Sequence, residues 1–452
     1  MELKALQIDL PEDILKAKWC GDFERAQRLI SQRLLNPKTP RCLIPRLELE
    51  REILLRLPLD YPYTETEALA VARQDIPGFS EEEFHDLQDS GAIDWIYVNG
   101  KPAFSRQFWE TLCKVHPDIA LRAHPETEDS AAEQTLLDDS IRLVKQQGHL
   151  DYHIQLRASL RLAESAFRPG EKLRVHLPVP TAAVNMRNVR ILSTLPEKHL
   201  LSPEDAPQRT VYLEDTPSEN RPYQVEYEYD SHIDYVNPCE SAVTSQHPEF
   251  DIDELPPHIR FTPFIRALCK ELTAGETNPL LKARRFYDYC TTVVTYSYMR
   301  EYFTITQIPD YAGLNQKGDC GVQALLFITL CRCAGIPARW QSGLFVSPYY
   351  QGCHDWAQFY VEPYGWMFAD PSFGGSAYRA GNTERHNYYF GNLDCFRMAA
   401  NSSFQAELSP SKQHLRIDPY DNQRGEAEYA DRGLLWNEVE ASWELLEIER
   451  LS

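Results

Sequence analysis

Three side chains in one stretch of the chain could together carry out acyl transfer. Cys320, His354 and Asp370 supply a thiol, an imidazole and a carboxylate. In such a set the thiolate attacks a carbonyl carbon, the imidazole moves the proton, and the carboxylate orients the imidazole. We therefore interpret Cys320 as a candidate nucleophile, His354 as a candidate base and Asp370 as the residue that orients the base.

Cys320 is predicted to lie where a loop enters a helix. The letters GDCG at positions 318–321 precede a run with apolar residues at helical spacing, and that run ends at Gly335. The N–H groups and the dipole at a helix N-terminus favour a thiolate and can stabilise an oxyanion. The alternative, a buried structural cysteine, fits Cys331 and Cys333 better than Cys320.

A hairpin is predicted to bring His354 and Asp370 together. Residues 354–361 alternate like a strand, 363–365 form a turn, and 366–370 return as a second strand. The midpoint of positions 354 and 370 is 362, close to the turn, so the two side chains should be direct or diagonal neighbours. Each alone could be an ordinary strand histidine or turn aspartate, but together with a helix-capping cysteine they favour a catalytic set.

These residues resemble the transglutaminase-like superfamily, whose core is papain-like. The resemblance rests on G-x-C opening a helix that ends AGIPAR, on H-D-W leading a strand, and on G-W-x-x-x-D-P closing a hairpin. It covers about residues 280–375. The resemblance implies that Cys320 is the nucleophile, His354 the general base and acid, and Asp370 the orienting residue.

The resemblance also implies a second oxyanion donor, an aromatic or amide side chain upstream of the cysteine. Tyr296, in the sequence TYSY, is the first candidate and Gln316 is the second; both could equally be packing residues. Trp356 belongs to an aromatic group that could line an acyl cleft. Most of that group is expected in the core or at the rim of the cleft.

The implied reaction passes through a thioester acyl-enzyme formed from an amide or peptide bond. Attack by water would make the protein a peptidase or amidase, and attack by a second amine would make it a transglutaminase. We expect a hydrolase that acts on a peptide or protein amide, because the calcium-binding loops of animal transglutaminases are not recognisable. The alternatives are a protein-glutamine transglutaminase with crosslinking activity and a non-catalytic interaction scaffold that retains the fold.

No cofactor or metal is expected. The pairs Cys331/Cys333 and Cys353/His354 lack a second C-x-x-C-type pair that would complete a tetrahedral site. The eleven cysteines have no framework spacing and are interpreted as reduced thiols. The N-terminus lacks a signal-peptide pattern, and no apolar run approaches about 18 residues. A cytoplasmic location without a membrane span is therefore expected.

The charge balance disfavours two classes of partner. The chain carries 46 basic and 67 acidic residues, which gives a net charge of −21 at pH 7. Such a surface repels phosphate backbones and anionic lipids, so nucleic acid and membrane surfaces are not expected as partners. The sequence gives no indication of the oligomeric state.

The elements that must position the candidate residues are predicted to form an α+β protein. A papain-like, transglutaminase-like catalytic core at 255–405 is preceded by a helical domain with a small hairpin at 1–125 and a β-sandwich-like domain at 148–238. A C-terminal extension at 406–452 is expected to pack on the core.

The helical domain is predicted from periodicity and capping signals. Apolar residues recur at helical spacing over 11–35, and Thr64 with Glu67 has the form of a capping box. Asn99-Gly100 is a strong hairpin turn. Helices followed by a hairpin also suggest a winged helix, but the acidic balance argues against DNA. A packing or partner-docking domain is the preferred interpretation.

The sandwich is predicted from short alternating segments with turn residues between them, beginning near Gly148. The polar residues 124–132 before it are interpreted as an exposed link. The last periodic segment, 434–451, could be an amphipathic helix or a strand.

Overall fold

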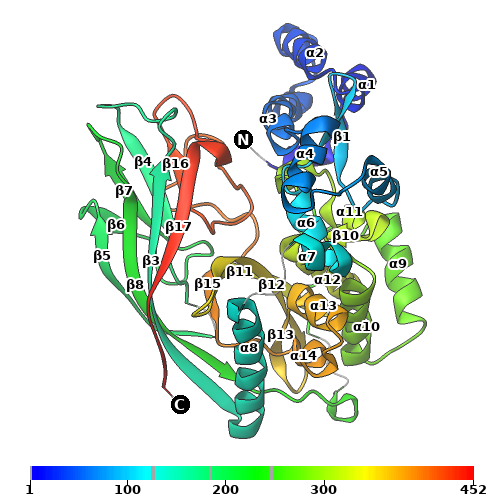
Figure 1. The fold of residues 1–452 in the computed structure, drawn as a ribbon, viewed down its shortest axis with the longest axis vertical. Helices are drawn as coiled ribbons and strands as arrows, with labels where there is room; N and C mark the ends of the chain where they lie inside the picture. Colours follow the sequence, from blue (N-terminus) through cyan, green and yellow to red (C-terminus); the bar gives the residue numbers. More distant parts are fainter. Residues whose placement is uncertain (1–2, 124–127, 183–184, 245–247, 452) are drawn as a thin grey trace. The chain divides into compact units, whose positions relative to one another are not determined.

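The computed structural model describes residues 3–123, 128–182, 185–244 and 248–451, which fold into two units (Figure 1). Unit 1 consists of Met1–Thr127, Leu255–Arg260 and Thr295–Asp319, and unit 2 of Glu128–Glu254, Phe261–Val294 and Cys320–Ser452. The predicted α+β class is confirmed, with an N-terminal helical region, a β-sandwich and a mixed core.

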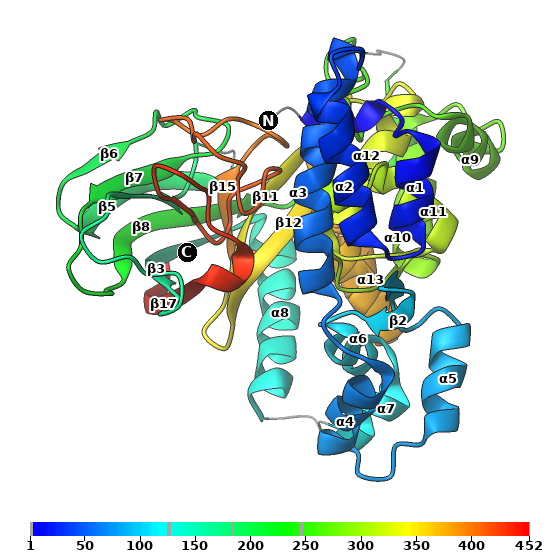
Figure 2. The same cartoon turned by 90° about the horizontal axis from the view of Figure 1, so that it is seen from above.

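Unit 1 begins with a helical region that carries one hairpin. Its helices are η1 (Leu3–Gln7), α1 (Glu12–Trp19), α2 (Phe23–Leu35), η2 (Arg41–Leu43), α3 (Ile44–Asp60), α4 (Glu65–Asp75), α5 (Glu81–Asp89), α6 (Phe108–Val115) and α7 (Pro117–Ala123), and its strands are β1 (Trp95–Val98) and β2 (Lys101–Phe104). Figure 2 shows α2 and α3 side by side. Buried apolar residues of α1, α2 and α3 form one cluster, which holds these helices together.

The helix predicted over residues 11–35 is two helices in the structure. The first stops before Gly21, which takes a left-handed conformation with φ of 72°. Asp22 then starts α2 by accepting the main-chain N–H of Arg25 at 3.0 Å. A Cβ on residue 21 would lie 2.2 Å from the carbonyl oxygen of Tyr97, so the position requires glycine. The apolar spacing concealed this break because both helices contribute to the same cluster.

Two local predictions in this region are confirmed. The Thr64 hydroxyl accepts the N–H of Glu67 at 3.4 Å, and the Glu67 carboxylate accepts the N–H of Thr64 at 2.8 Å. Asn99 and Gly100 form the two-residue turn between β1 and β2, with φ of 51° and 73°. Both signals depend only on residues that are close in the chain.

Unit 1 also takes up Thr295–Asp319, which the sequence placed in the core at 255–405. This segment contains β9 (Thr295–Tyr296), η4 (Tyr302–Thr304), α11 (Ile308–Asn315) and β10 (Lys317–Gly318). Lys317 Nζ lies 3.1 Å from Asp94 Oδ1, and the Tyr61 hydroxyl donates to Asp94 Oδ2 at 2.6 Å. Lys317 and Asp94 are 223 positions apart, so sequence spacing could not reveal the pair.

Unit 2 contains a β-sandwich of two four-stranded antiparallel sheets (Figures 1 and 2). The strand orders are β17-β3-β8-β5 and β16-β4-β7-β6. The strands are β3 (His149–Leu162), β4 (Leu173–Pro178), β5 (Met186–Leu195), β6 (His199–Leu201), β7 (Thr210–Asp215), β8 (Tyr223–Asp234), β16 (Glu426–Glu428) and β17 (Val439–Arg450). Alternate residues of β3, such as Leu156, Ala158 and Leu160, are buried, as the predicted period of two requires.

The C-terminal region completes both sheets of the sandwich. β17 runs along β3, from Val439 opposite Leu162 to Arg450 opposite Tyr152, and β16 pairs with β4. The segment 434–451, left open between helix and strand, therefore contains a strand. The C-terminal extension expected to pack on the core thus contributes these two strands to the sandwich, while Gln423 contacts the core at His354 and Asp355.

Helix α8 (Glu128–Gln147) precedes the first strand of the sandwich. The link predicted at 124–132 overlaps its first residues, and the part before Glu128 lies outside the described residues. Leu137 of α8 packs in one buried cluster with Phe345 and Phe396 of the core. The polar, acidic start of α8 concealed this helix, whose buried side becomes apolar only from Leu137 onward.

The region around the candidate residues forms a five-stranded antiparallel sheet with helices beside it (Figure 1). The strand order is β14-β13-β12-β11-β15. The elements are η3 (Glu240–Ala242), α9 (Pro263–Thr273), α10 (Pro279–Thr292), α12 (Cys320–Cys333), β11 (Ala338–Val346), β12 (Gln351–Val361), β13 (Gly365–Ala369), α13 (Pro371–Arg379), α14 (Thr383–Tyr388), β14 (Phe390–Gly391) and β15 (Arg397–Asn401). The short helix η5 (Trp436–Glu438) instead adjoins β17 of the sandwich. Helix α12 is buried on nearly all sides, because it packs against α9, α10, α13, β11 and β12.

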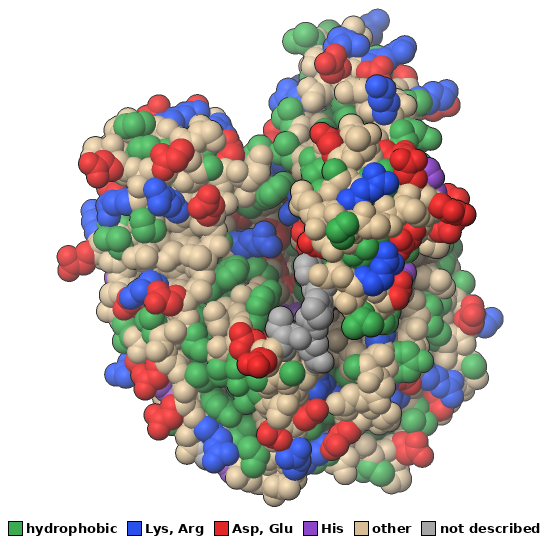
Figure 3. Space-filling view, in the orientation of Figure 1, with side chains coloured by type: hydrophobic (Ala, Val, Ile, Leu, Met, Phe, Trp, Pro, Cys, Tyr) green, Lys and Arg blue, Asp and Glu red, His purple; other side chains and the backbone are tan. Residues whose placement is uncertain are grey.

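The surface carries charges of both signs. On the face in Figure 3, acidic and basic side chains are interspersed with apolar ones. Among the described residues, none of the helices has the length and apolar character needed to span a bilayer.

Candidate active site

Cys320 is the first residue of α12, as the sequence predicted. The helix ends at Cys333, and Gly335 follows with φ of 76°, which also agrees with the prediction. The Cys320 side chain is half-buried, and its Sγ donates to Asp355 Oδ2 at 3.2 Å. The thiol thus lies at the positive end of the α12 dipole, where a negative charge on sulfur is favoured.

His354 and Asp370 are neighbours across the predicted hairpin. The register pairs Val361 with Gly365, which centres the hairpin on position 363. This centre is one residue later than the midpoint of 362 that the sequence predicted. The two residues are therefore diagonal across the two strands, and His354 Nε2 lies 2.8 Å from Asp370 Oδ2. Donation of the Nε2 proton to this carboxylate fixes the histidine tautomer and leaves Nδ1 as the nitrogen that can exchange a proton.

Asp370 is completely buried and held from three sides. It caps α13, because its Oδ1 accepts the main-chain N–H of Phe373 at 2.9 Å. Arg397 donates to its Oδ2 at 2.8 Å, the same oxygen that faces His354. Burial alone would raise the pKa of Asp370, but the charges of His354 and Arg397 and these hydrogen bonds hold it below its usual value. The carboxylate is therefore ionised.

Arg397 is a supporting residue that the sequence analysis missed. It opens β15, is completely buried, and also forms an ion pair with Asp394 at 2.7 Å. Its guanidinium lies 4.2 Å from the centroid of the Phe373 ring. The surrounding sequence carries few periodic signals, so only the fold reveals that this arginine compensates the buried charge of Asp370.

Asp355 is a second residue without a predicted role, although it stands in the H-D-W pattern. Besides the Cys320 thiol, it accepts Gln423 Nε2 at 2.7 Å on its Oδ1. Gln423 Nε2 also donates to the carbonyl oxygen of His354 at 2.9 Å. A loop from the C-terminal region therefore supports the strand that carries His354, and nothing in the spacing of the sequence indicated this.

Trp356, a candidate for lining the acyl cleft, is instead a core residue. Its side chain is completely buried, and its indole N–H donates to Gln341 at 2.5 Å. The ring stacks beside His354 with centroids 6.0 Å apart. The aromatic residues that are exposed nearby in the chain are Tyr349 and Tyr350, in the loop between β11 and β12.

The two predicted oxyanion donors both lie in the segment that leads to Cys320. Tyr296 is buried in β9, with Lys114 Nζ 3.8 Å from its ring centroid, and β9 pairs it with Gly318 of β10. Gln316 ends α11 in a left-handed conformation, and its carbonyl oxygen accepts the N–H of Thr295 at 2.8 Å. Both residues stabilise the segment, and their role as oxyanion donors stays a prediction.

Comparison with protein families identifies the segment of the sequence that contains these residues. The sequence model described as the transglutaminase-like superfamily matches residues 266–371. This segment belongs to the transglutaminase-like superfamily. The match includes all three candidate catalytic residues, Cys320, His354 and Asp370, and it confirms the resemblance inferred from the sequence.

Solved structures similar to this chain have low identity. One is a candidate cysteine protease from Cytophaga hutchinsonii, with 13% identity over 67% of this chain and 91% of that chain, and a TM-score of 0.43. Another is the periplasmic domain of TgpA from Pseudomonas aeruginosa, with 15% identity over 55% of this chain and 96% of that chain, and a TM-score of 0.27. With TM-scores below 0.5, these likenesses carry no functional conclusion. None of the curated proteins compared with the chain matches it.

The other cysteines of the transglutaminase-like core differ in their ionisation. Burial raises the pKa of Cys290 and Cys331, which makes both poor nucleophiles. A hydrogen bond from Cys269 lowers the pKa of Cys333 to about 7, and this thiol is only half-buried. Cys333 can therefore compete with Cys320 for an alkylating reagent, as can the exposed Cys239, whose pKa is lowered by a hydrogen bond with Ser241. In the described part of the chain, His, Cys, Asp and Glu side chains form no group of three or more that could hold a metal ion.

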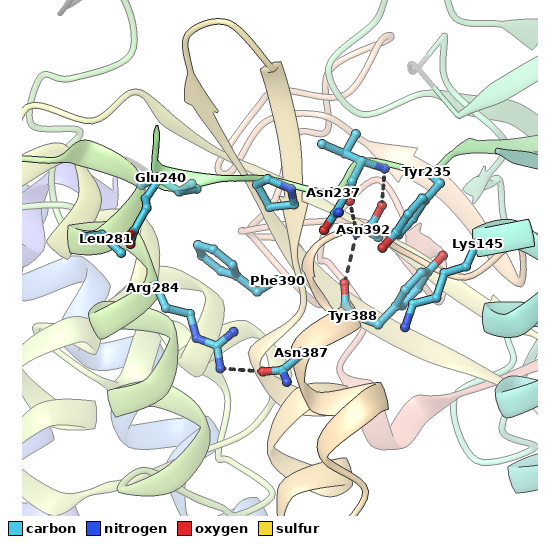
Figure 4. A pocket seen from close by; sticks show the side chains of 13 residues that line it. Lys145, Tyr235, Asn237, Glu240, Leu281, Arg284, Asn387, Tyr388, Phe390 and Asn392 are labelled. Atoms are coloured by element: carbon cyan, nitrogen blue, oxygen red, sulfur yellow. Dashed lines mark hydrogen bonds between the residues drawn. The ribbon is translucent and has the colours of Figure 1, made fainter. Parts of the chain in front are cut away.

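A pocket of about 350 Å³ lies elsewhere in unit 2 (Figure 4). Its wall contains Lys145 of α8, Arg284 of α10, Asn387, and the aromatic rings of Tyr388 and Phe390. Both cations are already engaged, Lys145 with Glu384 at 2.8 Å and Arg284 with Asp288 at 2.8 Å. None of the three candidate catalytic residues lines this pocket, so it is separate from the candidate active site.

Proposed function

We propose that Cys320, His354 and Asp370 are the catalytic residues of an acyl-transfer enzyme that hydrolyses amide or peptide bonds through a thioester. The observation that carries this proposal is the 2.8 Å contact between His354 Nε2 and Asp370 Oδ2, in a core whose α12 opens with Cys320. A thiol, an oriented imidazole and helix N–H groups are the parts that covalent acyl transfer requires.

The first half of the reaction forms the acyl-enzyme. His354 Nδ1 takes the proton of the Cys320 thiol, and Sγ attacks the carbonyl carbon of the amide. The main-chain N–H groups of the first turn of α12 stabilise the oxyanion of the tetrahedral intermediate. The protonated His354 then gives its proton to the leaving nitrogen, the C–N bond breaks, and an amine departs.

The second half regenerates the thiol. A water molecule loses a proton to His354 and attacks the thioester carbon, the C–S bond breaks, a carboxylic acid leaves, and His354 returns the proton to Sγ. The negative charge of Asp370 stabilises the imidazolium that forms in each half. If an amine takes the place of water, the product is a new amide, and the same residues perform transamidation.

Hydrolysis and transamidation are distinguished by their products. We would incubate the purified chain with a library of amide-containing peptides and one labelled primary amine, and analyse the products by mass spectrometry. Hydrolysis gives a carboxylic acid and a free amine, whereas transamidation gives a peptide that carries the label. We expect mainly the acid.

Two cysteine variants serve as controls for this assay. Cys320→Ala should lose turnover by at least about a thousandfold, as expected for removal of a covalent nucleophile. Cys333→Ser changes a thiol at the other end of the same helix and should retain full turnover. Equal turnover by Cys320→Ala would contradict the proposal. Retention of partner binding without any turnover by the parent chain would indicate an interaction scaffold.

A further inference from the structure

A carboxylate lies directly against the candidate nucleophile. Asp355 is buried, and its Oδ2 accepts the thiol of Cys320 at 3.2 Å. Asp355 follows His354 in β12, so the same strand carries the candidate base and the carboxylate that contacts the sulfur. The reaction proposed above uses His354 and Asp370 but leaves this carboxylate without a role.

Asp355 is held in its ionised form by its neighbours. Gln423 Nε2 donates to its Oδ1 at 2.7 Å, and the carboxyl group of Asp421 forms a further hydrogen bond to it. Burial, followed by the charge of Asp355, raises the pKa of Asp421 well above its usual value, so Asp421 is the protonated donor. A carboxylate that accepts hydrogen bonds from a thiol, an amide and a carboxylic acid is favoured in its charged form.

We propose that Asp355 is a further catalytic residue, which keeps Cys320 as an oriented, neutral thiol in the resting protein. This inference rests on the proposed function, because it assigns Cys320 as the nucleophile. A thiolate at Sγ would lie beside the negative charge of Asp355, so the carboxylate opposes loss of the proton. The same contact fixes the direction of the S–H bond. When His354 acts as the base, it must take the thiol proton away from Asp355.

The titratable groups near this pair include the cation Arg424, which is engaged by Cys353. Burial raises the pKa of Cys353 to about 11, so this thiol is neutral near pH 7, and Arg424 is hydrogen-bonded to it. Burial likewise raises the pKa of Asp418, which is next to Asp421 in the same loop network. Tyr350 also interacts with Cys353 and Cys320, and its phenol is neutral near pH 7 because its pKa lies above the usual value of about 10.

Two further groups belong to the immediate surroundings of Cys320. Asp319 precedes it in the chain and accepts the hydroxyl of Tyr302 at 2.5 Å. His354 is engaged by Asp370 through Nε2. Asp355 is in contact with Sγ, so removal of its negative charge should make the thiol more acidic.

The test measures how fast Cys320 reacts with iodoacetamide between about pH 5 and pH 10, with peptide mass spectrometry to identify the modified residue. The chain carries Cys333→Ser and Cys239→Ser in all samples, which removes the two other thiols with a lowered pKa. In Asp355→Asn we expect the midpoint of the pH profile to fall by about one unit, which is a roughly tenfold faster reaction below the midpoint. Glu362→Gln, which removes a carboxylate directly after the same strand, should leave the midpoint unchanged.

A second variant protects the test against misfolding. Asp355→Ser removes the same charge with a smaller side chain, and should lower the midpoint in the same direction. Circular dichroism establishes which variants fold. An unchanged or higher midpoint in either folded variant overturns the role of Asp355.

Failure of this inference is distinguishable from failure of the proposed function. Alkylation requires no substrate, so a lowered midpoint in a chain that turns over no amide supports the role of Asp355 and contradicts the hydrolase. Normal turnover with an unchanged midpoint contradicts only the role of Asp355.

Discussion

Arg397 Nη1 donates to Asp370 Oδ2 at 2.8 Å, and both side chains are completely buried. The same oxygen faces His354, so the ionisation of Asp370 and the orientation of the histidine both depend on an arginine 27 positions later in the chain. A buried charge without its partner is costly, which makes this pair central to the stability of the site.

Arg397→Met should therefore lower the free energy of unfolding by about 3–5 kcal/mol, because it leaves Asp370 and Asp394 buried without their cation. Urea denaturation of the purified variants measures this change. Arg187 is exposed on β5, and Arg187→Met should change the free energy of unfolding by less than about 0.5 kcal/mol. Similar small changes for both variants would show that the buried pair contributes little.

Asp370 should stabilise the fold in a pH-dependent manner. Its folded-state pKa lies below the usual value, because the charges of His354 and Arg397 outweigh the effect of burial. Its contribution is therefore complete above the unfolded-state pKa of about 3.9 and is lost as the pH falls through the lower folded-state pKa. We expect Asp370→Asn to cost about 3 kcal/mol near pH 7, with a smaller cost below about pH 4. A cost that grows as the pH falls would contradict this account.

Asp421 should behave in the opposite way. Burial and the charge of Asp355 raise the pKa of Asp421 in the folded state. At neutral pH the folded chain therefore holds a proton on Asp421 that the unfolded chain has already lost. This linkage lowers stability as the pH rises from the unfolded-state pKa toward the folded-state pKa. Asp421→Asn removes the titration, so the advantage of the variant over the parent should increase between about pH 4 and pH 7. Urea denaturation across this range measures the difference, and a constant difference would refute the assignment.

The contact between Lys317 and Asp94 should couple two distant parts of unit 1. Both side chains are largely buried, and the charges of Lys317 and Arg300 lower the pKa of Asp94 although burial opposes them. A double-mutant cycle with Lys317→Met and Asp94→Asn should give a coupling free energy of at least about 1 kcal/mol. The exposed pair Lys16–Glu12 should give less than about 0.5 kcal/mol in the same experiment. Equal coupling in the two cycles would rule out the buried pair as an anchor.

Gly343 should tolerate no side chain. It pairs with His354 across the sheet, and a Cβ at this position would lie 1.9 Å from the carbonyl oxygen of Met398 on the neighbouring strand. Gly343→Ala should lower the free energy of unfolding by about 3 kcal/mol, because β11 and β15 must move apart. Gly78→Ala is the matched control, since a Cβ there has no neighbour within 4 Å. Thermal unfolding of both variants tests this contrast, and equal midpoints would contradict it.

The sequence revealed those parts of the site that depend on neighbours in the chain. The start of α12 at Cys320 and the hairpin between β12 and β13 are local, so helix signals and turn arithmetic located them to within a residue. The supporting residues Arg397 and Gln423 reach the site from segments 27 and 69 positions away from their partners Asp370 and His354. No periodicity specifies such contacts, because they are set by how the strands and loops pack.

The same limit applies to the fold. The strands of the sandwich alternate clearly, yet the pairing of β17 with β3 depends on residues such as Trp443 and Ala158 that are far apart in the sequence. The assignment of Thr295–Asp319 to unit 1 depends on buried charges that the chain brings together only when folded. Charged side chains are usually exposed, so nothing in the sequence indicated that these charged residues lie in the interior.

The most direct test of the catalytic assignment is detection of the acyl-enzyme. The chain is mixed with peptide and amide libraries, quenched in acid within seconds, and analysed by intact-mass and peptide mass spectrometry. We expect an added mass equal to the acyl part of one substrate, located on Cys320, absent from Cys320→Ala and lost on longer incubation as water resolves the thioester. An unmodified Cys320 with every library, or the same adduct in Cys320→Ala, would contradict the assignment of Cys320 as the nucleophile.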